Sequence, residues 1–322
     1  MEYRKLISFG KNSFVVSLPK PWVRQHKLVK GDLIYIEENG PNLALSKKEF
    51  NGDAEDREET IIIDGKNSDW IERKVCSAYI KNCNKITLKG NEIKGKVKEM
   101  QKIMQNLIAL EVMEQTSNTI IAKVFLNMDT VSIEELIRKM DIVTRTMIKE
   151  TCEIFEEDNY ESLNERDRNV NRLYFLLYRS VLYNVENPMK AVKNFKLSPI
   201  QAMRLHNLAF YIEGIADEAR RIARHVRKLK PSEKQRKVIE KILMDVYEYY
   251  VNTMKSAHTN DHNLALNIAD QKGDFYSRIE ALKPKNGENV GMHKVMNRLQ
   301  RMTSLIHNMG RIVYTLGVTI EE

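Results

Sequence analysis

Hydrophobic residues in the second half of the chain recur at the three-to-four-residue spacing of amphipathic helices. The run of Ile133, Leu136 and Ile137 begins after Ser132, which with Glu135 has the pattern of a helix capping box. Five further helices are predicted, over residues 160–183, 198–230, 234–258, 261–282 and 289–316. Two successive units of three helices, each of roughly 100 residues, predict two tandem antiparallel bundles.

The first 48 residues show shorter apolar runs, separated by glycine, proline and asparagine. Two strands are predicted around a turn at 10–13, followed by a short helix from Trp22 to Lys27 that Pro21 can open. A turn at Lys30–Gly31–Asp32 leads to a second hairpin, over 33–36 and 43–45, around Asn39–Gly40–Pro41. This segment is therefore predicted to be a small β domain.

Residues 60–128 alternate between strand and helix patterns. Strands are predicted at 60–64, 86–89 and 119–126, and helices at 68–82, capped by Ser68, and at 94–107. Residues 111–116 fit either the end of a helix or the start of a strand. The segment shows no catalytic motif and is interpreted as an α+β connector.

The chain is therefore predicted to be multidomain, with a small all-β N-terminal domain, an α+β connector and an all-α C-terminal domain of two tandem three-helix bundles. The acidic, polar stretch from Lys47 to Glu59 predicts a linker. The predicted boundaries are 1–48 for the β domain, 49–59 for the linker, 60–128 for the connector, and 129–230 and 231–322 for the bundles.

Composition narrows the class of protein. With 30% charged and 7% aromatic residues, the chain fits a soluble, mostly helical protein, and it lacks a membrane-length apolar run and a signal-peptide pattern. Its three cysteines, Cys76, Cys83 and Cys152, cannot all pair and show no metal-binding spacing. A cytoplasmic protein with reduced thiols is expected.

Positive charge is concentrated at the N-terminus. Residues 1–30 contain seven Lys or Arg and one acid, Glu2, which makes six of the eight net positive charges of the chain. Such local charge favours a polyanionic partner for this domain alone. The layout of two hairpins around a Pro-opened helix and a Gly-Asp turn resembles the swapped-hairpin domains of the AbrB/MazE/SpoVT group, over residues 3–48.

That resemblance implies a dimer formed by exchange of hairpins and a DNA-contacting surface. Carried over to this sequence, the contact positions are Arg4, Lys11 and Arg24, with Lys5 and Lys20 nearby. Lys11 stands where arginine is common in the group, and lysine makes a point contact to phosphate rather than a bidentate one. A small hairpin domain also cannot bury an adequate core alone, which independently favours dimerisation. The alternatives are a solvated basic face on an ordinary small β domain, or a member of the group used only for interaction.

Acidic pairs on the predicted helices are candidate metal ligands. Glu213 with Asp217, and Asp270 with Asp274, are four residues apart, so each pair is expected on one helix face. At an offset of 103 residues, Asp167 corresponds to Asp270 and Asn171 to Asp274, which favours an internal duplication. Such hard oxygen ligands suit iron, manganese, magnesium or calcium, although a single pair is usually a solvated face.

The segment Tyr211-Ile-Glu-Gly-Ile-Ala-Asp-Glu-Ala-Arg-Arg-Ile-Ala, within two tandem bundles, resembles PhoU proteins, which are regulators of phosphate uptake. The resemblance covers roughly residues 130–318 and implies metal clusters at carboxylate pairs on the second and third helix of each bundle. Asp167, Glu213, Asp217, Asp270 and Asp274 match this pattern. Asn171, Ser304 and Asn308 depart from it, so each bundle keeps one full pair.

Basic residues and a histidine pair on the predicted helices are further candidates for binding sites. The basic residues Arg220, Arg221, Arg224, Arg227 and Lys228 could hold an acidic partner, DNA or phosphate, but a solvated helix face is the simpler interpretation. His258 and His262 have the spacing of a zinc pair, but a third ligand is not evident.

No motif supports catalysis, because the chain has no P-loop, nucleophile elbow or zinc-protease motif. The sequence therefore predicts a transcriptional regulator that binds DNA as a homodimer or higher oligomer and controls phosphate uptake or phosphate-responsive genes. The alternative is a PhoU-type regulator that docks on a phosphate transporter or signalling protein, with the hairpin domain serving only dimerisation. A third interpretation, an antitoxin, is disfavoured by the long folded C-terminal half.

Overall fold

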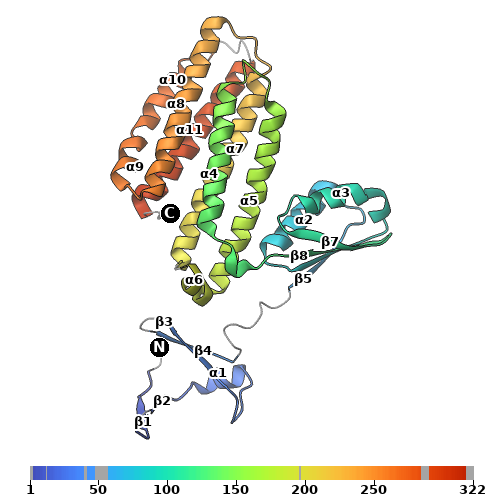
Figure 1. Cartoon of the computed structure of the whole chain (residues 1–322), viewed down its shortest axis with the longest axis vertical. Coiled ribbons are helices and arrows are strands. Elements are labelled where there is room, and N and C mark those ends of the chain that lie inside the picture. Colours follow the sequence, from blue (N-terminus) through green and yellow to red (C-terminus); the bar gives the residue numbers. More distant parts are fainter. Residues whose placement is uncertain are drawn as a thin grey trace. The chain divides into compact units, whose positions relative to one another are not determined.

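The computed structural model describes residues 3–11, 13–39, 42–47, 57–195, 197–283 and 290–316. It divides the chain into two compact units, Met1–Asp56 (unit 1) and Arg57–Glu322 (unit 2). Short strands come first, a mixed α/β segment follows, and long helices form the rest of the chain (Figure 1). The predicted fold class is therefore confirmed.

Unit 1 consists of two antiparallel hairpins and one short helix. Its elements are β1 (Ile7–Phe9), β2 (Ser13–Val15), α1 (Lys20–Gln25), β3 (Tyr35–Asn39) and β4 (Asn42–Ser46). Gly10 and Gly31 adopt positive φ angles in the turns, a conformation that side chains other than glycine adopt only under strain. The helix begins two residues before the predicted Trp22, because Pro19 already takes the N-cap position. The predicted turn at Gly40–Pro41 and most of the predicted linker lie outside the described residues.

Unit 2 begins with the connector, a four-stranded sheet whose α2 and α3 lie together on one face (Figure 1). Its elements are β5 (Glu58–Ile62), α2 (Ser68–Ile80), β6 (Lys85–Lys89), α3 (Ile93–Gln105), β7 (Leu110–Gln115) and β8 (Thr119–Val124). The strand order is β5-β6-β8-β7, with β5 parallel to β6 and the other neighbours antiparallel.

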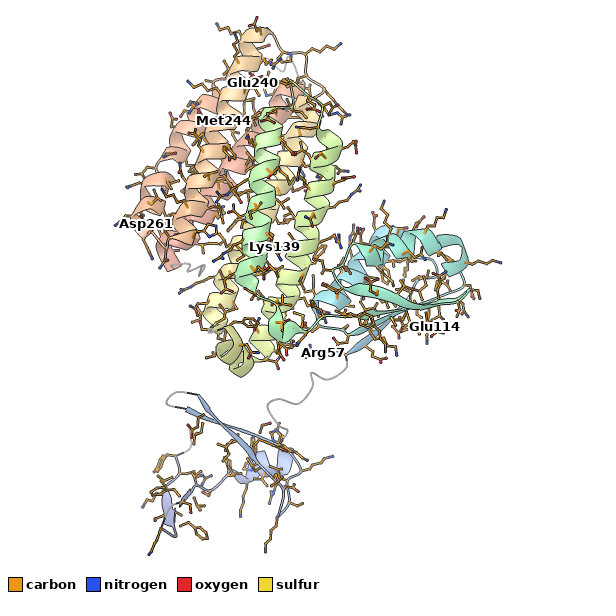
Figure 2. All side chains as sticks on the ribbon, viewed as in Figure 1. Arg57, Glu114, Lys139, Glu240, Met244 and Asp261 are labelled. Carbon is orange, nitrogen blue, oxygen red and sulfur yellow. The ribbon has the colours of Figure 1, made fainter. Side chains whose placement is uncertain are left out.

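The connector settles one ambiguity that the sequence left open and differs from the sequence predictions in two details. The ambiguous segment at 111–116 is strand, and Glu114 on it, labelled in Figure 2, pairs with Ile121 of β8. The cap of α2 is Asn67, whose side chain accepts a hydrogen bond from the Trp70 amide, and not the predicted Ser68. β5 begins at Glu58, inside the predicted linker.

The remainder of unit 2 is helical. After a 3₁₀ turn at Met128–Thr130, the helices are α4 (Ile133–Cys152), α5 (Tyr160–Glu186), α6 (Pro188–Phe195), α7 (Pro199–Val226), α8 (Glu233–His258), α9 (His262–Ala269), α10 (Gln271–Glu280) and α11 (Val290–Leu316). Ser132 caps α4 as predicted, and Ser198 and Ser232 form complete capping boxes at α7 and α8.

One prediction about the helices was wrong, and one short helix was missed. The helix expected over 261–282 is divided at Asp270 into α9 and α10, and Asp261 (Figure 2) caps α9 by accepting from the Leu264 amide. The short helix α6 was not predicted. It begins at Pro188, which fits the first turn of a helix because proline needs no amide donor there.

The two bundles share one hydrophobic core. α4, α5 and α7 form the first three-helix unit, and α8, α9 with α10, and α11 form the second. α7 packs on α4, on α5 and most extensively on α11, while α4 also contacts α8 (Figure 1). α7 is lined with small and branched apolar residues, among them Ile212, Ile215, Ala219 and Ile222, that are fully buried. α7 and α11 thus form the centre of one continuous helical domain.

A buried arginine joins the connector to this domain. Arg179 of α5 is only 1% exposed, and its guanidinium donates to the backbone carbonyls of Tyr79 and Cys83 and to Asn84 Oδ1. It also lies 4.9 Å from the centre of the Tyr79 ring. Because these acceptors close the end of α2, Arg179 fixes α2 against α5.

Candidate functional site

The five predicted DNA-contacting residues are all exposed in unit 1. Arg4 and Lys5 precede β1, Lys11 lies in the β1–β2 turn, and Lys20 and Arg24 lie in the first and last turns of α1. The turn and helix positions leave long cationic side chains available to a phosphate backbone. Direct contact with DNA stays a prediction.

Unit 1 has almost no interior of its own. None of its described residues is buried, and large apolar side chains face solvent, including Leu33 (75% exposed), Phe9 (69%) and Phe14 (68%). Exposed apolar area of this kind normally marks an interaction surface. A second copy of unit 1 is the partner that the sequence predicts for it.

We therefore expect a fragment of residues 1–56 to be a dimer or larger and to lose its structure on dilution, because the hairpins of one copy cannot bury their own side chains. Light scattering and circular dichroism over a concentration series measure both properties. A folded monomer at low micromolar concentration would contradict this assembly.

A carboxylate cluster lies between α5 and α7 in the first three-helix unit. Asp167 of α5 and Asp217 of α7 are bridged by Arg220, with Nε–Oδ2 and Nη2–Oδ1 distances of 3.0 and 2.6 Å. Arg221 adds a second ion pair to Asp217, Nη2–Oδ2, at 2.6 Å. Both carboxylates are therefore paired with arginine, through one oxygen of Asp167 and both oxygens of Asp217. Asn171, which replaces a carboxylate here, instead donates to the Asp167 backbone carbonyl at 3.0 Å.

Glu213 stands in a different environment from Asp217. Burial, followed by the negative charges of Asp217 and Asp167, raises the pKa of Glu213 to about 7. Burial and the charge of Glu213 also raise the pKa of Tyr174, to about 12. Tyr174 in turn lies 3.3 Å from His206, between the hydroxyl and Nε2. This seam of α5 and α7 can therefore take up a proton near neutral pH.

The raised pKa of Glu213 makes stability depend on pH. The folded chain binds the proton of the Glu213 carboxyl more tightly than the unfolded chain does. The contribution of this protonation to the free energy of unfolding is therefore complete below about pH 4.5 and is lost as pH rises through about 7. Glu213→Gln should therefore be more stable than the wild type at pH 8, by about 1–2 kcal/mol after allowing for solvent screening, and similar at pH 4. Urea unfolding at both pH values tests this, with the exposed Glu165→Gln on α5 as the control. Equal effects of Glu213→Gln at both pH values would count against it.

The second pair, Asp270 and Asp274, is arranged differently from the prediction. The two residues do not lie within one continuous helix, because Asp270 is the junction between α9 and α10. Both are exposed, and Asp274 pairs with Arg278 at 3.4 Å between Oδ2 and Nη1. Ser304 on α11 is hydrogen bonded to the Tyr276 hydroxyl.

Metal binding at Asp167, Glu213, Asp217, Asp270 and Asp274 stays a prediction. Within the described ranges, no group of three or more His, Cys, Asp or Glu side chains is arranged to hold a metal ion. Asp217 of the first pair is ion-paired with two arginines, and the second pair is open to solvent. These residues therefore do not fit a multinuclear cluster in the arrangement seen here.

The histidine pair is separated by the end of a helix. His258 is the last residue of α8, and the distance between its Nε2 and Oδ2 of the buried Asp141 is 3.2 Å. His262, in contrast, is exposed on α9. Arg145 also donates to Asp141, from Nε and Nη2 at 2.8 and 2.7 Å. Burial alone would raise the pKa of Asp141, but these hydrogen bonds hold it below its usual value. His258 therefore links α8 to α4 through a hydrogen bond with the buried Asp141.

Sequence reasoning missed the buried charges. Asp141, Arg179 and Glu218 are each at most 3% exposed, and each joins two separate helices. In the sequence, such a residue can be recognised only because it falls at a helical position otherwise occupied by apolar residues. Arg179, for example, lies on the same helix face as Leu176 and Tyr183. The expectation that the arginines of α7 form a solvated face was wrong for Arg220 and Arg221, which are half-buried in ion pairs.

Comparison with known proteins identifies two segments. A family model described as the PhoU domain matches residues 137–226, which run from α4 to the end of α7. A second model, described as antidote-toxin recognition MazE, bacterial antitoxin, matches residues 7–53. No curated protein matches the chain.

Both matching families are regulatory. The chain thus joins a MazE/AbrB-type N-terminal segment to a PhoU domain. None of the helices described in the structure has the length and hydrophobicity needed to cross a membrane.

Proposed function

We propose that the chain is a DNA-binding transcriptional regulator of phosphate uptake or phosphate-responsive genes, acting as a homodimer or higher oligomer. The observation that carries the proposal is the union of a MazE/AbrB-type segment, whose predicted contact cations are exposed, with a PhoU domain. Unit 1 supplies the cations that bind polyanions, and the helical domain supplies the surface on which a signal could act.

Immunoprecipitation of bound DNA, from cells grown with and without phosphate, tests this proposal. We expect recovered fragments to cluster upstream of genes for phosphate uptake, with occupancy that changes on starvation. Footprinting with the purified full chain then defines the operator. Recovery of no specific fragment under either condition would reject DNA-binding regulation.

The second candidate is a PhoU-type regulator that docks on a phosphate transporter or signalling protein, with unit 1 serving only dimerisation. The specific observation in its favour is the exposed apolar surface of unit 1, which dimerisation alone would explain. The two candidates differ in the salt dependence of DNA binding, because only a phosphate-contacting protein releases counterions from DNA.

A further inference from the structure

Two stripes of basic side chains face the same seam of the helical domain. Arg221 and Arg224 lie on one face of α7, Lys228 continues this line in the turn just after the helix, and Lys294, Arg298 and Arg301 follow one face of α11. The spacings of three, four and seven residues keep each stripe on one side of its helix. These six residues are called the basic ridge below.

A buried carboxylate brings the two stripes together. Glu218 of α7 is 1% exposed and its Oε1 lies 3.1 Å from Arg298 Nη1 and 3.1 Å from Arg301 Nε. Arg221 Nη1 stands 3.6 Å from the same oxygen. One turn further along α7, burial and the nearby charges of Arg224, Lys294, Arg298 and Lys228 together lower the pKa of His225. The basic ridge is therefore continuous across α7 and α11.

Cations on the ridge outnumber the acids that the chain supplies. Two carboxylates, Asp217 and Glu218, form ion pairs with residues of the ridge. Asp217 is also paired with Arg220, which lies outside the ridge, and Glu218 is divided among three arginines. Arg224, Lys228 and Lys294 are exposed and form no ion pair with any carboxylate in the described part of the chain. Like charges held this close repel, so binding of an anion here is favoured.

The shape of the ridge indicates which kind of anion fits. Seven residues of helix cover roughly 10 Å, whereas one phosphate ion would reach only two or three of the cations. An extended peptide places side chains of one face about 6.8 Å apart, so two or three successive acidic residues match this length. Arginine is also enriched at the centre of protein–protein interfaces.

We propose that the basic ridge is a docking surface for an extended acidic segment of a partner protein, whose Asp and Glu side chains alternate along one face. The ridge lies on α7, the turn that follows it, and α11, all within unit 2, so this inference does not depend on DNA binding by unit 1.

Binding of a fluorescent peptide of alternating glutamate and serine to the full-length chain, followed by anisotropy at several salt concentrations, tests the proposal. The triple variant Arg224→Gln/Lys228→Gln/Lys294→Gln removes exposed charges that hold no described ion pair, so it should fold normally. It should weaken binding on the order of tenfold and flatten the salt dependence. The matched control is Lys234→Gln/Lys241→Gln/Lys255→Gln, three exposed lysines of α8 with the same change in net charge.

Glu218→Gln provides a test of opposite sign. It removes the internal competitor for Arg298 and Arg301, so the peptide should bind several-fold more tightly. No binding by the wild type at low salt, equal losses in the triple variant and its control, or no tightening by Glu218→Gln would each overturn the proposal. Ridge-dependent binding of inorganic phosphate or duplex DNA, without binding of the peptide, would replace it with a small-anion or nucleic-acid site.

Discussion

Replacing Arg4, Lys11 and Arg24 together by alanine should weaken DNA binding on the order of 100-fold or more near 0.15 M salt and lower the log–log salt slope by about 2.7 for each subunit that contacts the DNA. Each lost phosphate contact is expected to contribute about 0.9 to that slope, because each bound cation releases counterions from the duplex. All three side chains are exposed, so their removal should leave the structure of unit 1 intact. Titration of the full chain on the footprinted operator, at five or more salt concentrations, measures both quantities.

The control for this experiment is Lys30→Ala, an exposed cation of the same unit outside the predicted contacts. It should leave the slope within error of the wild type. Lys5→Ala and Lys20→Ala should give smaller losses, since these residues are predicted only to lie near the contacts. If the triple variant binds with unchanged affinity and slope, these three residues do not contact DNA.

Arg179→Met should lower the free energy of unfolding by roughly 3–5 kcal/mol, the largest effect expected for a single change in unit 2. Methionine fills much of the space but donates nothing, so the carbonyls of Tyr79 and Cys83 and the Asn84 side chain lose the buried donors that they now share. The free energy of unfolding of Arg179→Lys should lie between those of the wild type and Arg179→Met, because a lysine reaches fewer of these acceptors.

Urea denaturation followed by circular dichroism measures this loss, and Arg168→Met on the exposed face of α5 is the matched control. The control should change stability by less than about 0.5 kcal/mol, as surface substitutions usually do. A loss below about 1 kcal/mol for Arg179→Met would show that the connector is not fixed to α5 through this side chain.

The order of elements could be predicted from the sequence because the patterns are strong. Long helices with capping serines, such as those at Ser132 and Ser198, and strands bounded by glycine and asparagine carry local signals. Where local signals compete, tertiary pairing decides. Residues 111–116 become strand because β8 lies beside them, with a bulge between Val112 and Glu114 that no local pattern announces.

The sequence predicted which acidic residues form the carboxylate cluster of α5 and α7, but not how arginine side chains are arranged among them. The pairing of Asp167 with Glu213 and Asp217 across α5 and α7 follows from the resemblance to PhoU proteins, whereas the arginine that separates two of them does not. Arg220 is one helical turn from Asp217, and its spacing alone fits a solvated face equally well. The break at Asp270 is also invisible locally, since the residues on both sides keep helical patterns.

Because the two three-helix units share one hydrophobic core, they depend on each other for folding, unlike independent repeats. In a pair of independent repeats, one copy can be lost or can drift while the other keeps the fold. Here α7 packs against α4 and α5 on one side and against α11 on the other, so the apolar surface that α7 turns to α11 is covered by the second half of the domain. The segment matched by the PhoU model, residues 137–226, would expose that surface if it stood alone. The second half therefore acts as an obligatory counterpart, and the two halves are bound to evolve as one folding unit.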